Sequence, residues 1–411
     1  MKAGWPVKKL GEVCQIKPPK SEARSLLAAD GLVSFLPMEK MGIGEKFVRA
    51  THVKPLSAVV GSYTYFADGD VLLAKITPCF ENGKLGIAEG LINGIGFGSS
   101  EYIVFRPEKM LGKEWLYYYL SRETFRVEGA ARMSGAVGHK RVAKEFIESY
   151  PIPVPPLSEQ QRIVSILDEA FDGIAAVKAN AEKNLQNARA LFECHLQSVF
   201  TQHGEGWMKE LIGSVCDVQH GFAFDGVDFS NDVPAGNPLV ITPGNFTEDG
   251  RLLFNEKNTK RFSGAPLDRY RFGIGDLVVV MTDLSSKMKI LGKPAFVETN
   301  DVLHNQRIGR VVFLNDRIEK RFLYYFMMSE QFLKSIKMSA TETMVKHTAP
   351  KRILNNLIPF PRDRKAQQAI VAQFDFLREE TQRLESIYQR KLAALDALKK
   401  SLLHQAFSGH L

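Results

Sequence analysis

The segment PLSEQQRIV, residues 156–164, has a counterpart in RKAQQAIVAQF, residues 364–374. Both contain the pattern Gln-Gln-x-Ile-Val, which begins at Gln160 and again at Gln367 in a chain of 411 residues. One repeated pattern of this length is weak evidence for a duplicated chain. The rest of the chain decides whether the repeat reflects its architecture.

Further landmarks repeat in the same order along the chain. The matched pairs are WPVKKLGEVC (5–14) with WMKELIGSVC (207–216), GDVLLAKITP (69–78) with GDLVVVMTDL (275–284), WLYYYLSRETF (115–125) with FLYYFMMSEQF (322–332), His139 with His347, and IPVP (152–155) with IPFP (358–361). The offset stays between 202 and 208 residues. A period of about half the chain indicates a duplicated domain pair and not a solenoid.

Each half begins with a mixed segment of about 155 residues. Apolar runs at 71–73 and 278–280 follow Gly-Asp turns and predict buried strands. The glycine-rich NGIGFGSS, residues 93–100, predicts a loop. Residues 116–125 and 323–332 predict one short helix in each half. A proline-rich hinge then interrupts regular structure.

A long helix is predicted after each hinge, because apolar residues keep a 4-3 spacing over four to five heptads. The stripe comprises Ile163, Leu167, Ala170, Ile174, Val177, Ala181, Ala188 and Leu191 in the first half, and Ile370, Phe374, Leu377, Leu384, Tyr388, Leu395, Leu398 and Leu402 in the second. Ser158 with Gln161 fits a capping box. Asn184 and Lys391 interrupt both stripes at one repeat position. Either they fix the register, or the neighbouring leucines fill the seam and the polar residues point outward.

The composition indicates an ordinary globular protein, with 45% hydrophobic and 24% charged residues and a net charge of +8. The net charge, counted as Lys and Arg minus Asp and Glu, is +5 in residues 1–155, −3 in 156–206, +3 in 207–361 and +3 in 362–411. A mild positive excess is compatible with a polyanionic partner and equally with a basic protein that has none. The scattered four cysteines, and the lack of a signal or membrane span, predict a reduced, cytoplasmic protein with no membrane partner.

Signatures of catalysis are missing from the sequence. It contains no NPPY or DPPY stretch of an amino-methyltransferase and no GxxxxGK[ST] loop. GIGFG at 94–98 is not a GxGxxG, and the nine histidines show no metal-ligand spacing. A binding protein is therefore a simpler interpretation than an enzyme.

The hinge PPLSEQ at 155–160, the two long helices and the terminal FSGHL at 407–411 resemble the DNA-specificity subunits of Type I restriction–modification systems. The resemblance covers the whole chain. The second hinge, PRDRKAQ at 361–367, departs from the family pattern because Leu and Glu are missing. The two hinges therefore differ as docking sites, whereas the duplication of the chain is unaffected.

The resemblance implies an α+β fold with two mixed α/β target-recognition domains, 1–155 and 207–361, separated by two long antiparallel coiled-coil helices, 156–206 and 362–411. Each domain would read half of a split, asymmetric double-stranded DNA site. Two methyltransferase subunits would dock on the helices, and a restriction motor-nuclease subunit could join. Catalysis, with S-adenosylmethionine, ATP and Mg²⁺, would belong to those partners, leaving this chain without a catalytic residue, cofactor or metal. The docking residues expected from this resemblance are Leu157, Ser158, Glu159, Gln160, Gln161, Ile163, Gln367, Gln368 and Ile370.

Candidate DNA contacts lie on polar or basic loops of the two larger segments. Asn, Gln and Arg suit base edges, whereas Lys and Ser suit phosphates. The candidates are Lys75, Thr77, Asn82, Lys84, His139, Lys140 and Arg141 in the first half, and Thr282, Ser285, Ser286, Lys287, Lys289, Asn305, Gln306, Arg307, Lys346, His347, Lys351 and Arg352 in the second. For each one, a solvated loop residue is the alternative. For the whole chain, the alternative is a coiled-coil scaffold that binds protein and no DNA.

Overall fold

The computed structural model describes most of the chain. The described residues are 4–50, 52–136, 138–202, 204–225, 228–230, 234, 236–264, 268–285, 287–340 and 345–411. The chain divides into two compact units. The first comprises Met1–Glu182 with Arg390–Leu411, and the second comprises Lys183–Gln389.

The first unit is built on two sheets and a strand pair. Its five-stranded sheet has the order β2 (Cys14–Ile16), β10 (Tyr102–Pro107), β7 (Val71–Ala74), β8 (Leu85–Ala88) and β4 (Phe47–Val48). Its four-stranded sheet has the order β5 (His52–Pro55), β3 (Leu32–Leu36), β9 (Ile95–Gly98) and β6 (Thr64–Ala67), and β1 (Val7–Lys9) pairs with β11 (Pro151–Pro153). Strand β7 lies between two neighbours and is buried along its length, which explains its uninterrupted apolar run.

Short helices complete this unit. They are α1 (Leu10–Val13), α2 (Ser21–Leu26), η1 (Met38–Lys40), α3 (Leu56–Val59), η2 (Ile92–Gly94), α4 (Lys113–Leu120), α5 (Glu123–Ala130) and α6 (Lys144–Ser149). Helix α4 buries Trp115 and the three tyrosines that follow Leu116. The tyrosine-rich run is therefore part of the core.

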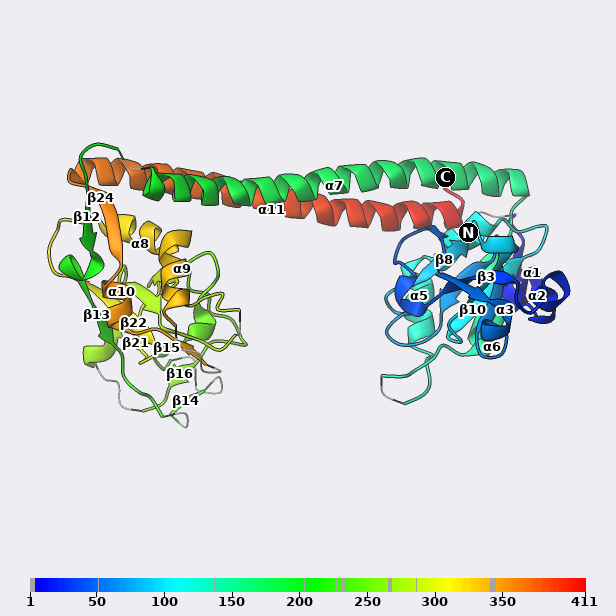
Figure 1. Ribbon diagram of the computed structural model, residues 1–411, viewed down its shortest axis with the longest axis horizontal. Coiled ribbons are helices and arrows are strands. Elements are labelled where there is room, and N and C mark those ends of the chain that lie inside the picture. The colour runs from blue at the N-terminus through cyan, green and yellow to red at the C-terminus, as the bar shows by residue number, and fades with distance from the viewer. Residues whose placement is uncertain are drawn as a thin grey trace. The chain divides into compact units, whose positions relative to one another are not determined.

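The second unit repeats this construction. Its sheets have the orders β13 (Cys216–His220), β22 (Ile308–Phe313), β18 (Leu277–Val280), β20 (Pro294–Phe296), and β14 (Phe229–Ser230), β16 (Arg261–Phe262), β15 (Leu239–Ile241), β21 (Val302–His304), β17 (Arg271–Phe272). Two strand pairs join β12 (Trp207–Leu211) to β24 (Leu357–Pro361) and β19 (Thr282–Asp283) to β23 (Lys346–His347). The helices are η3 (Ile212–Ser214), η4 (Pro243–Asn245), η5 (Asp268–Tyr270), α8 (Lys320–Met328), α9 (Glu330–Met338) and α10 (Pro350–Leu354). Figure 1 shows α8 beside the long helices, with β13 and β22 farther from them.

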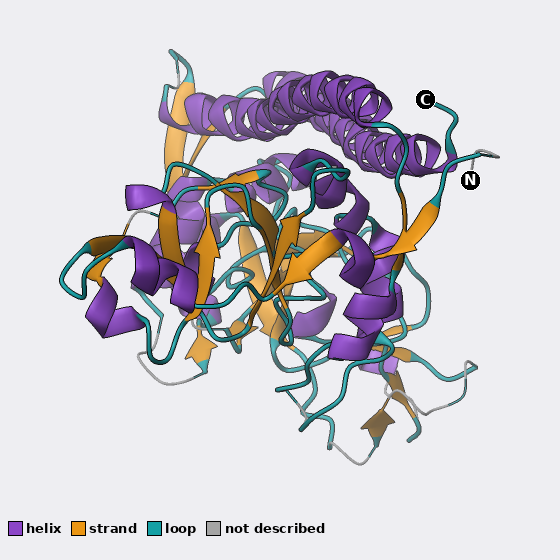
Figure 2. Ribbon diagram, turned by 90° about the vertical axis from the view of Figure 1, so that its right-hand side faces the viewer, coloured by secondary structure: helices purple, strands orange, loops and turns teal. Residues whose placement is uncertain are grey.

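Two long helices, α7 (Leu157–Thr201) and α11 (Arg364–Ser408), each contribute to both units. In the first unit, Lys178 of α7 pairs with Asp396 of α11 at 3.0 Å, so the start of one helix lies against the end of the other. In the second unit, Arg189 pairs with Glu385 at 2.8 Å, in the same antiparallel sense. Figure 2 shows the two helices side by side. The predicted mixed α/β class with long helices is confirmed.

Several details differ from the prediction for the helices. Helix α7 already begins at Leu157, so Ser158 lies inside it and the predicted capping box is wrong. Three stripe positions, Val177, Leu191 and Leu398, are exposed. Near Leu191 the half-buried Phe192 packs on Tyr325 in its place.

The polar interruptions of the stripe point outward. Asn184 and Lys391 are exposed, whereas Leu185 and Leu392 are half-buried. This arrangement agrees with the alternative in which the leucines fill the seam. The polar pair therefore does not lie between the helices.

The glycine-rich segment 93–100 was predicted as a loop, but it contains strand β9. A Cβ atom at Gly96 would lie 2.2 Å from the Phe66 ring, and one at Gly98 would lie 2.5 Å from the Leu36 carbonyl oxygen. Glycine is required here because neighbouring groups approach the strand closely.

The single helices predicted at 116–125 and 323–332 are each two helices. The chain is extended at Arg122 and at Ser329, which separate α4 from α5 and α8 from α9. The Ser329 side chain accepts a hydrogen bond from the backbone N–H of Phe332 and caps α9. A local cap thus overrides the continuous apolar pattern.

Candidate nucleic-acid interface

In the first unit, two predicted loops lie side by side at the end of β7. The Thr77 N–H donates to the Lys140 carbonyl at 2.9 Å, and the Val142 N–H donates to the Lys75 carbonyl at 3.0 Å. Ile76 and Arg141 form an isolated antiparallel bridge. Candidates that are about 65 residues apart in the sequence therefore share one edge.

An acidic residue organises the charge of this edge. The Arg141 guanidinium donates to both carboxylate oxygens of Glu101, at 2.9 and 2.7 Å, and the Lys75 ammonium lies 3.9 Å from the same carboxylate. These cations hold the pKa of the Glu101 carboxyl below its usual range, and the Arg141 hydrogen bond is the main cause. His139 and Lys140 are exposed, and no partner of the Lys140 ammonium is found among the described residues. Lys140 is therefore the cation best placed to bind an external anion.

The other candidates of this unit are partly held by the chain itself. The Lys84 ammonium donates to the Met38 carbonyl at 2.7 Å, and the Thr77 hydroxyl donates to Glu81 at 2.9 Å. Asn82 is exposed and lines a cavity near the long helices. The loop at 77–84 is thus anchored, with Asn82 as its exposed polar side chain.

In the second unit, three predicted segments meet. Strand β19 pairs with β23, so that Thr282 lies opposite His347 and Asp283 lies opposite Lys346. The Met281 N–H donates to the Arg307 carbonyl at 2.9 Å, which brings the third segment to the same edge.

Two candidates at this edge are buried and hold its shape. The Thr282 side chain is 2% exposed, and its hydroxyl lies 2.9 Å from His347 Nδ1. Asn305 is 6% exposed and accepts a hydrogen bond from the Arg307 N–H at 2.9 Å. Gln306 and Arg307 are exposed beside them. This arrangement presents one amide and one guanidinium to the outside.

The remaining candidates of this unit surround the edge. Lys289 pairs with Glu248 at 2.5 Å, and an Arg352 nitrogen donates to the His347 carbonyl at 3.4 Å. Ser285, Lys287 and Lys351 are exposed, and Lys346 is half-buried. Ser286 lies outside the described residues.

The structure shifts the repeat alignment at this edge. His139 was matched with His347, but Arg141 bridges Ile76 as His347 pairs with Thr282. The structural counterpart of His347 is therefore Arg141, two residues farther along. The sequence alignment paired two histidines because they are identical, whereas the strand register pairs His347 with Arg141.

Glu101 was missed as a member of the edge because the predicted contacts comprise only basic, amide and hydroxyl residues. Glu101 directly precedes β10, and Arg307 directly precedes the matching strand β22. The sequence offset alone could have paired these two residues. The two residues occupy equivalent positions, which shows that the two edges are built alike. They carry opposite charges, so the edges differ in chemistry.

Among the predicted docking residues, Gln160 and Gln367 have a role within the chain. Gln160 is 1% exposed; its amide donates to the Met110 and Pro155 carbonyls, and its side-chain oxygen accepts from the Gly112 N–H at 2.8 Å. Gln367 makes the same three contacts, with Arg317, Pro361 and the Glu319 N–H. Both side chains use their hydrogen bonds to fix the start of a long helix against its hinge.

The other docking candidates divide by exposure. Leu157, Ser158, Gln161 and Gln368 are exposed, Glu159 and Ile370 are half-buried, and Ile163 is buried. The exposed members form the part of these helix starts that a partner protein can reach. Docking there stays a prediction.

A tyrosine–carboxylate contact fixes each long helix to its unit, and the sequence did not reveal it. The Tyr118 hydroxyl donates to Asp168, which also accepts from Lys46 at 2.7 Å. In the second unit, Tyr325 donates to Asp375, which pairs with Arg321. The partners come from separate elements, so the contact is visible only in the folded chain.

The described residues contain neither a membrane-spanning helix nor a metal site. No helix there is long and apolar enough to cross a bilayer. No group of three or more His, Cys, Asp or Glu side chains is arranged there to hold a metal ion.

Comparison with known proteins gives a family match over the first half. Residues 2–186 match the model of the Type I restriction modification DNA specificity domain. A 162-residue region is 37% identical to the Type I restriction enzyme EcoAI specificity subunit of Escherichia coli, covering 39% of this chain and 27% of that protein. The match thus spans about a quarter of that relative.

Two comparisons cover nearly the whole chain. The Type I restriction enzyme MjaVIII specificity subunit of Methanocaldococcus jannaschii is 24% identical over 99% of this chain and 93% of its own length. One solved structure comes from work on the structural basis of complex assembly and conformational transition of the type I R-M system. It superposes with a TM-score of 0.79 at 19% identity, and the match covers 100% of this chain and 99% of that one. The resemblance to Type I specificity subunits that the sequence indicates is confirmed.

Proposed function

We propose that this chain, whose residues 2–186 match a Type I restriction modification DNA specificity domain, is a non-catalytic DNA-recognition subunit. Each unit reads one half of a split, asymmetric DNA target. One observation carries this proposal: the two units build the same polar edge and place different side chains on it. The first edge carries Lys140, Arg141 and Glu101, and the second carries Lys346, His347 and Arg307.

The chemistry of the edges suits this task. Arg and Gln side chains read base edges in the major groove, and Lys binds phosphates. Gln306 and Arg307 are exposed on a turn whose backbone is fixed by the buried Asn305. A supported turn presents its side chains in a defined geometry, as specific readout requires.

The long helices supply the second part of the proposal. They act as a spacer between half-sites and as the docking surface for two methyltransferase subunits, with a motor-nuclease subunit as a further partner. The exposed residues at the helix starts, with Leu157 and Gln161 in the first and Gln368 in the second, support this role. S-adenosylmethionine, ATP and Mg²⁺ serve the partner subunits.

The test substitutes two exposed residues of the second edge, one at a time, in the assembled complex. Arg307→Ala and Gln306→Ala should each relax the methylated motif at one position of the second half-site, with a loss of about 1–3 kcal/mol in discrimination. Gln331→Ala, on an exposed position of α9 in the same unit, is the matched control. An unchanged motif in both edge variants would show that this edge does not read bases.

A further inference from the structure

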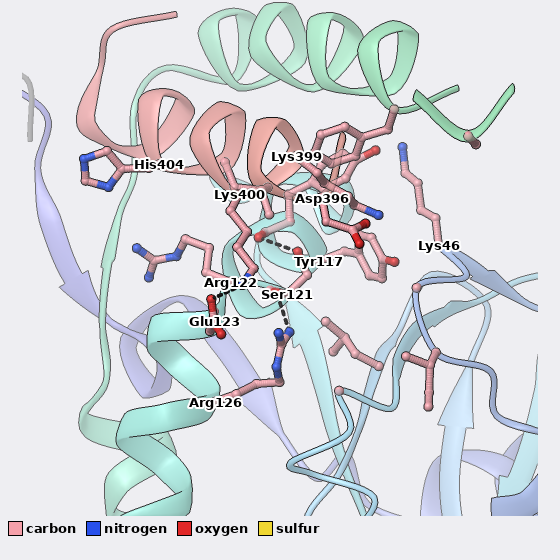
Figure 3. A pocket seen from close by; sticks show the side chains of 18 of the residues that line it. Lys46, Tyr117, Ser121, Arg122, Glu123, Arg126, Asp396, Lys399, Lys400 and His404 are labelled. Carbon is pink, nitrogen blue, oxygen red and sulfur yellow. Dashed lines mark hydrogen bonds and ion pairs between the residues drawn. The ribbon is translucent and has the colours of Figure 1, made fainter. Parts of the chain in front are cut away.

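A cavity of about 880 Å³ lies in the first unit between α4, α5 and the two long helices. Tyr117, Phe171 and Phe47 provide aromatic walls. Figure 3 shows Lys399 and Lys400 of α11 above the cavity and Arg122 and Arg126 below them. Of the predicted DNA-contact residues in this unit, Asn82 alone lines the cavity, so the cavity is separate from the predicted DNA-binding edge.

In the second unit, the chain itself occupies the corresponding position. The loop after η4 packs on α8, where the Tyr324 hydroxyl donates to the Gly250 carbonyl at 3.0 Å. Arg378 of α11 donates to the Asp249 carbonyl at 2.8 Å. A short acidic peptide segment, with Asp249 at its centre, thus covers Tyr324.

In the first unit, no backbone carbonyl of the described residues accepts a hydrogen bond from the equivalent tyrosine. Tyr117 occupies the same repeat position as Tyr324, 207 residues earlier, and lines the cavity. The matching loop, 42–47 after η1, contributes to the cavity wall. Among the described residues, no hydrogen-bond partner of the Tyr117 hydroxyl is present. Tyr117 is only 5% exposed, so it reaches the cavity with the tip of a mostly buried side chain.

The charges around the cavity differ from those of the second unit. At the same repeat positions, Lys399 corresponds to Phe192 and Lys400 to Glu193. Arg122 corresponds to Ser329. The Lys399 ammonium lies 4.9 Å from the centre of the Phe171 ring, and burial lowers its pKa. Lys400 pairs with Glu123 at 2.8 Å, but both side chains are more than half exposed, so this pair is weak.

We propose that the cavity binds an extended acidic segment of a partner protein, in place of the loop that covers Tyr324 in the second unit. The Tyr117 hydroxyl donates to a backbone carbonyl of this segment, and Lys399 binds its carboxylate. Because the second unit closes the equivalent space with its own chain, only one such segment binds per chain. The partner is a methyltransferase subunit, so this inference rests on the proposed function.

The balance of charge favours a peptide over DNA. Lys46, Lys399 and Lys400 share the cavity lining with Asp168, Asp172 and Asp396. A continuous row of phosphates would meet these carboxylates, and like charges repel at such distances. A segment with one or two acidic side chains and a neutral backbone satisfies both kinds of group.

The test measures the affinity between this chain and its cognate methyltransferase subunit. Lys399→Glu should weaken binding at least about tenfold, as expected for loss of a charge-assisted hydrogen bond. Lys399→Met, which removes the ammonium group but keeps an unbranched apolar side chain, should weaken it in the same direction. Lys334→Glu is the matched control, because Lys334 is exposed on α9, which is neither a long helix nor part of the cavity lining. Equal melting temperatures of the variants would exclude a folding defect.

A cross-link locates the occupant. Ser121 lines the cavity, and Ser121→p-benzoylphenylalanine should cross-link to a methyltransferase peptide that contains Asp or Glu. Unchanged affinity in both Lys399 variants, or a cross-link to DNA with loss of DNA affinity alone, would overturn the inference. If the wild-type chain does not bind the methyltransferase subunit, the proposed function fails first and the inference fails with it.

Discussion

Gln160 and Gln367 explain at the residue level why Gln-Gln-x-Ile-Val occurs twice. The first glutamine of each pair is buried and makes three hydrogen bonds that join a hinge, a loop and a helix start. The second glutamine, Gln161 or Gln368, is exposed. The repeated pattern therefore combines one structural residue with one that is free to meet a partner.

Replacing Gln160 should destabilise the first unit. Gln160→Leu would leave the partly buried Gly112 N–H and the buried Pro155 carbonyl without their partner, at a total cost of about 2 kcal/mol or more. Gln161→Leu, one residue along and exposed, should change the free energy of unfolding by no more than about 0.5 kcal/mol. Urea denaturation of the two variants measures this difference. Equal stability would contradict the structural role of Gln160.

Protonation of His304 should make the second unit sensitive to acid. His304 is 2% exposed, and burial lowers its pKa from 6.5 to about 4. The unfolded chain binds a proton below pH 6.5 that the folded chain does not bind, so stability falls as the pH falls from 6.5 to 4. The shift corresponds to a loss of up to about 3 kcal/mol, and none is expected above pH 6.5.

The measurement compares denaturation midpoints of the wild type and His304→Gln at pH 7, 5.5 and 4.5. The variant should show a smaller loss of stability between pH 7 and 4.5 than the wild type. Parallel pH profiles for the two proteins would remove His304 as the source of acid sensitivity.

At the level of elements, each long helix is held by aromatic packing at the unit that it enters. In the second unit, Phe374 of α11 is fully buried; it stacks on Phe200 of α7 and makes a tilted ring contact with Tyr325 of α8. In the first unit, Phe407 of α11 packs on Trp115 of α4 at 4.5 Å. Phe374 belongs to the predicted stripe, whereas Phe407 lies beyond it, so the buried helix faces extend past the stripe at the helix end.

Phe374→Ala should therefore destabilise the second unit by about 3–5 kcal/mol. Phe376→Ala is the matched control, because Phe376 is 64% exposed on the same helix. Thermal unfolding of both variants gives the comparison. A loss of equal size in Phe376→Ala would show that the packing does not lie where the structure places it.

Sequence pattern predicted the long helices, the buried strands and the duplication, because each leaves a local or periodic trace. It failed where tertiary packing decides. Strand β9 needs Gly96 to admit the Phe66 ring, and glycine in a sequence otherwise predicts a loop. The polar edges were predicted as separate loops, but Glu101 and the burial of Thr282 became visible only with the strand register. The cavity near Tyr117 left no sequence trace, since its walls come from five separate segments.

At the level of the whole molecule, both units contain one end of each long helix. Phe200 and Phe407 occupy the same repeat position, 207 residues apart. Phe200 packs on Phe322 and Phe407 packs on Trp115, which also occupy equivalent positions. The two units are therefore completed in the same way by helix ends from different parts of the chain.

A fragment of residues 1–206 should consequently form a dimer. It retains Trp115 but loses Phe407, and Phe200 of a second copy can fill the vacated position with two-fold symmetry. Light scattering should give twice the fragment mass, and Phe200→Asp should abolish the dimer. Expressed with the methyltransferase subunit, the fragment should direct methylation to a palindromic site built from the first half-target. A monomeric fragment, or methylation at the full asymmetric site, would show that the units are not equivalent modules.

The central claim is that this chain selects the DNA sequence that its partners modify. Long-read mapping of methylated adenines in a strain with the partner subunits, with and without this chain, tests it most directly. The predicted result is one bipartite motif with a fixed gap, lost on deletion of the chain and altered only in its second half when residues 207–361 are replaced by those of a differently specific relative. A methylated motif that persists unchanged without the chain would contradict the account.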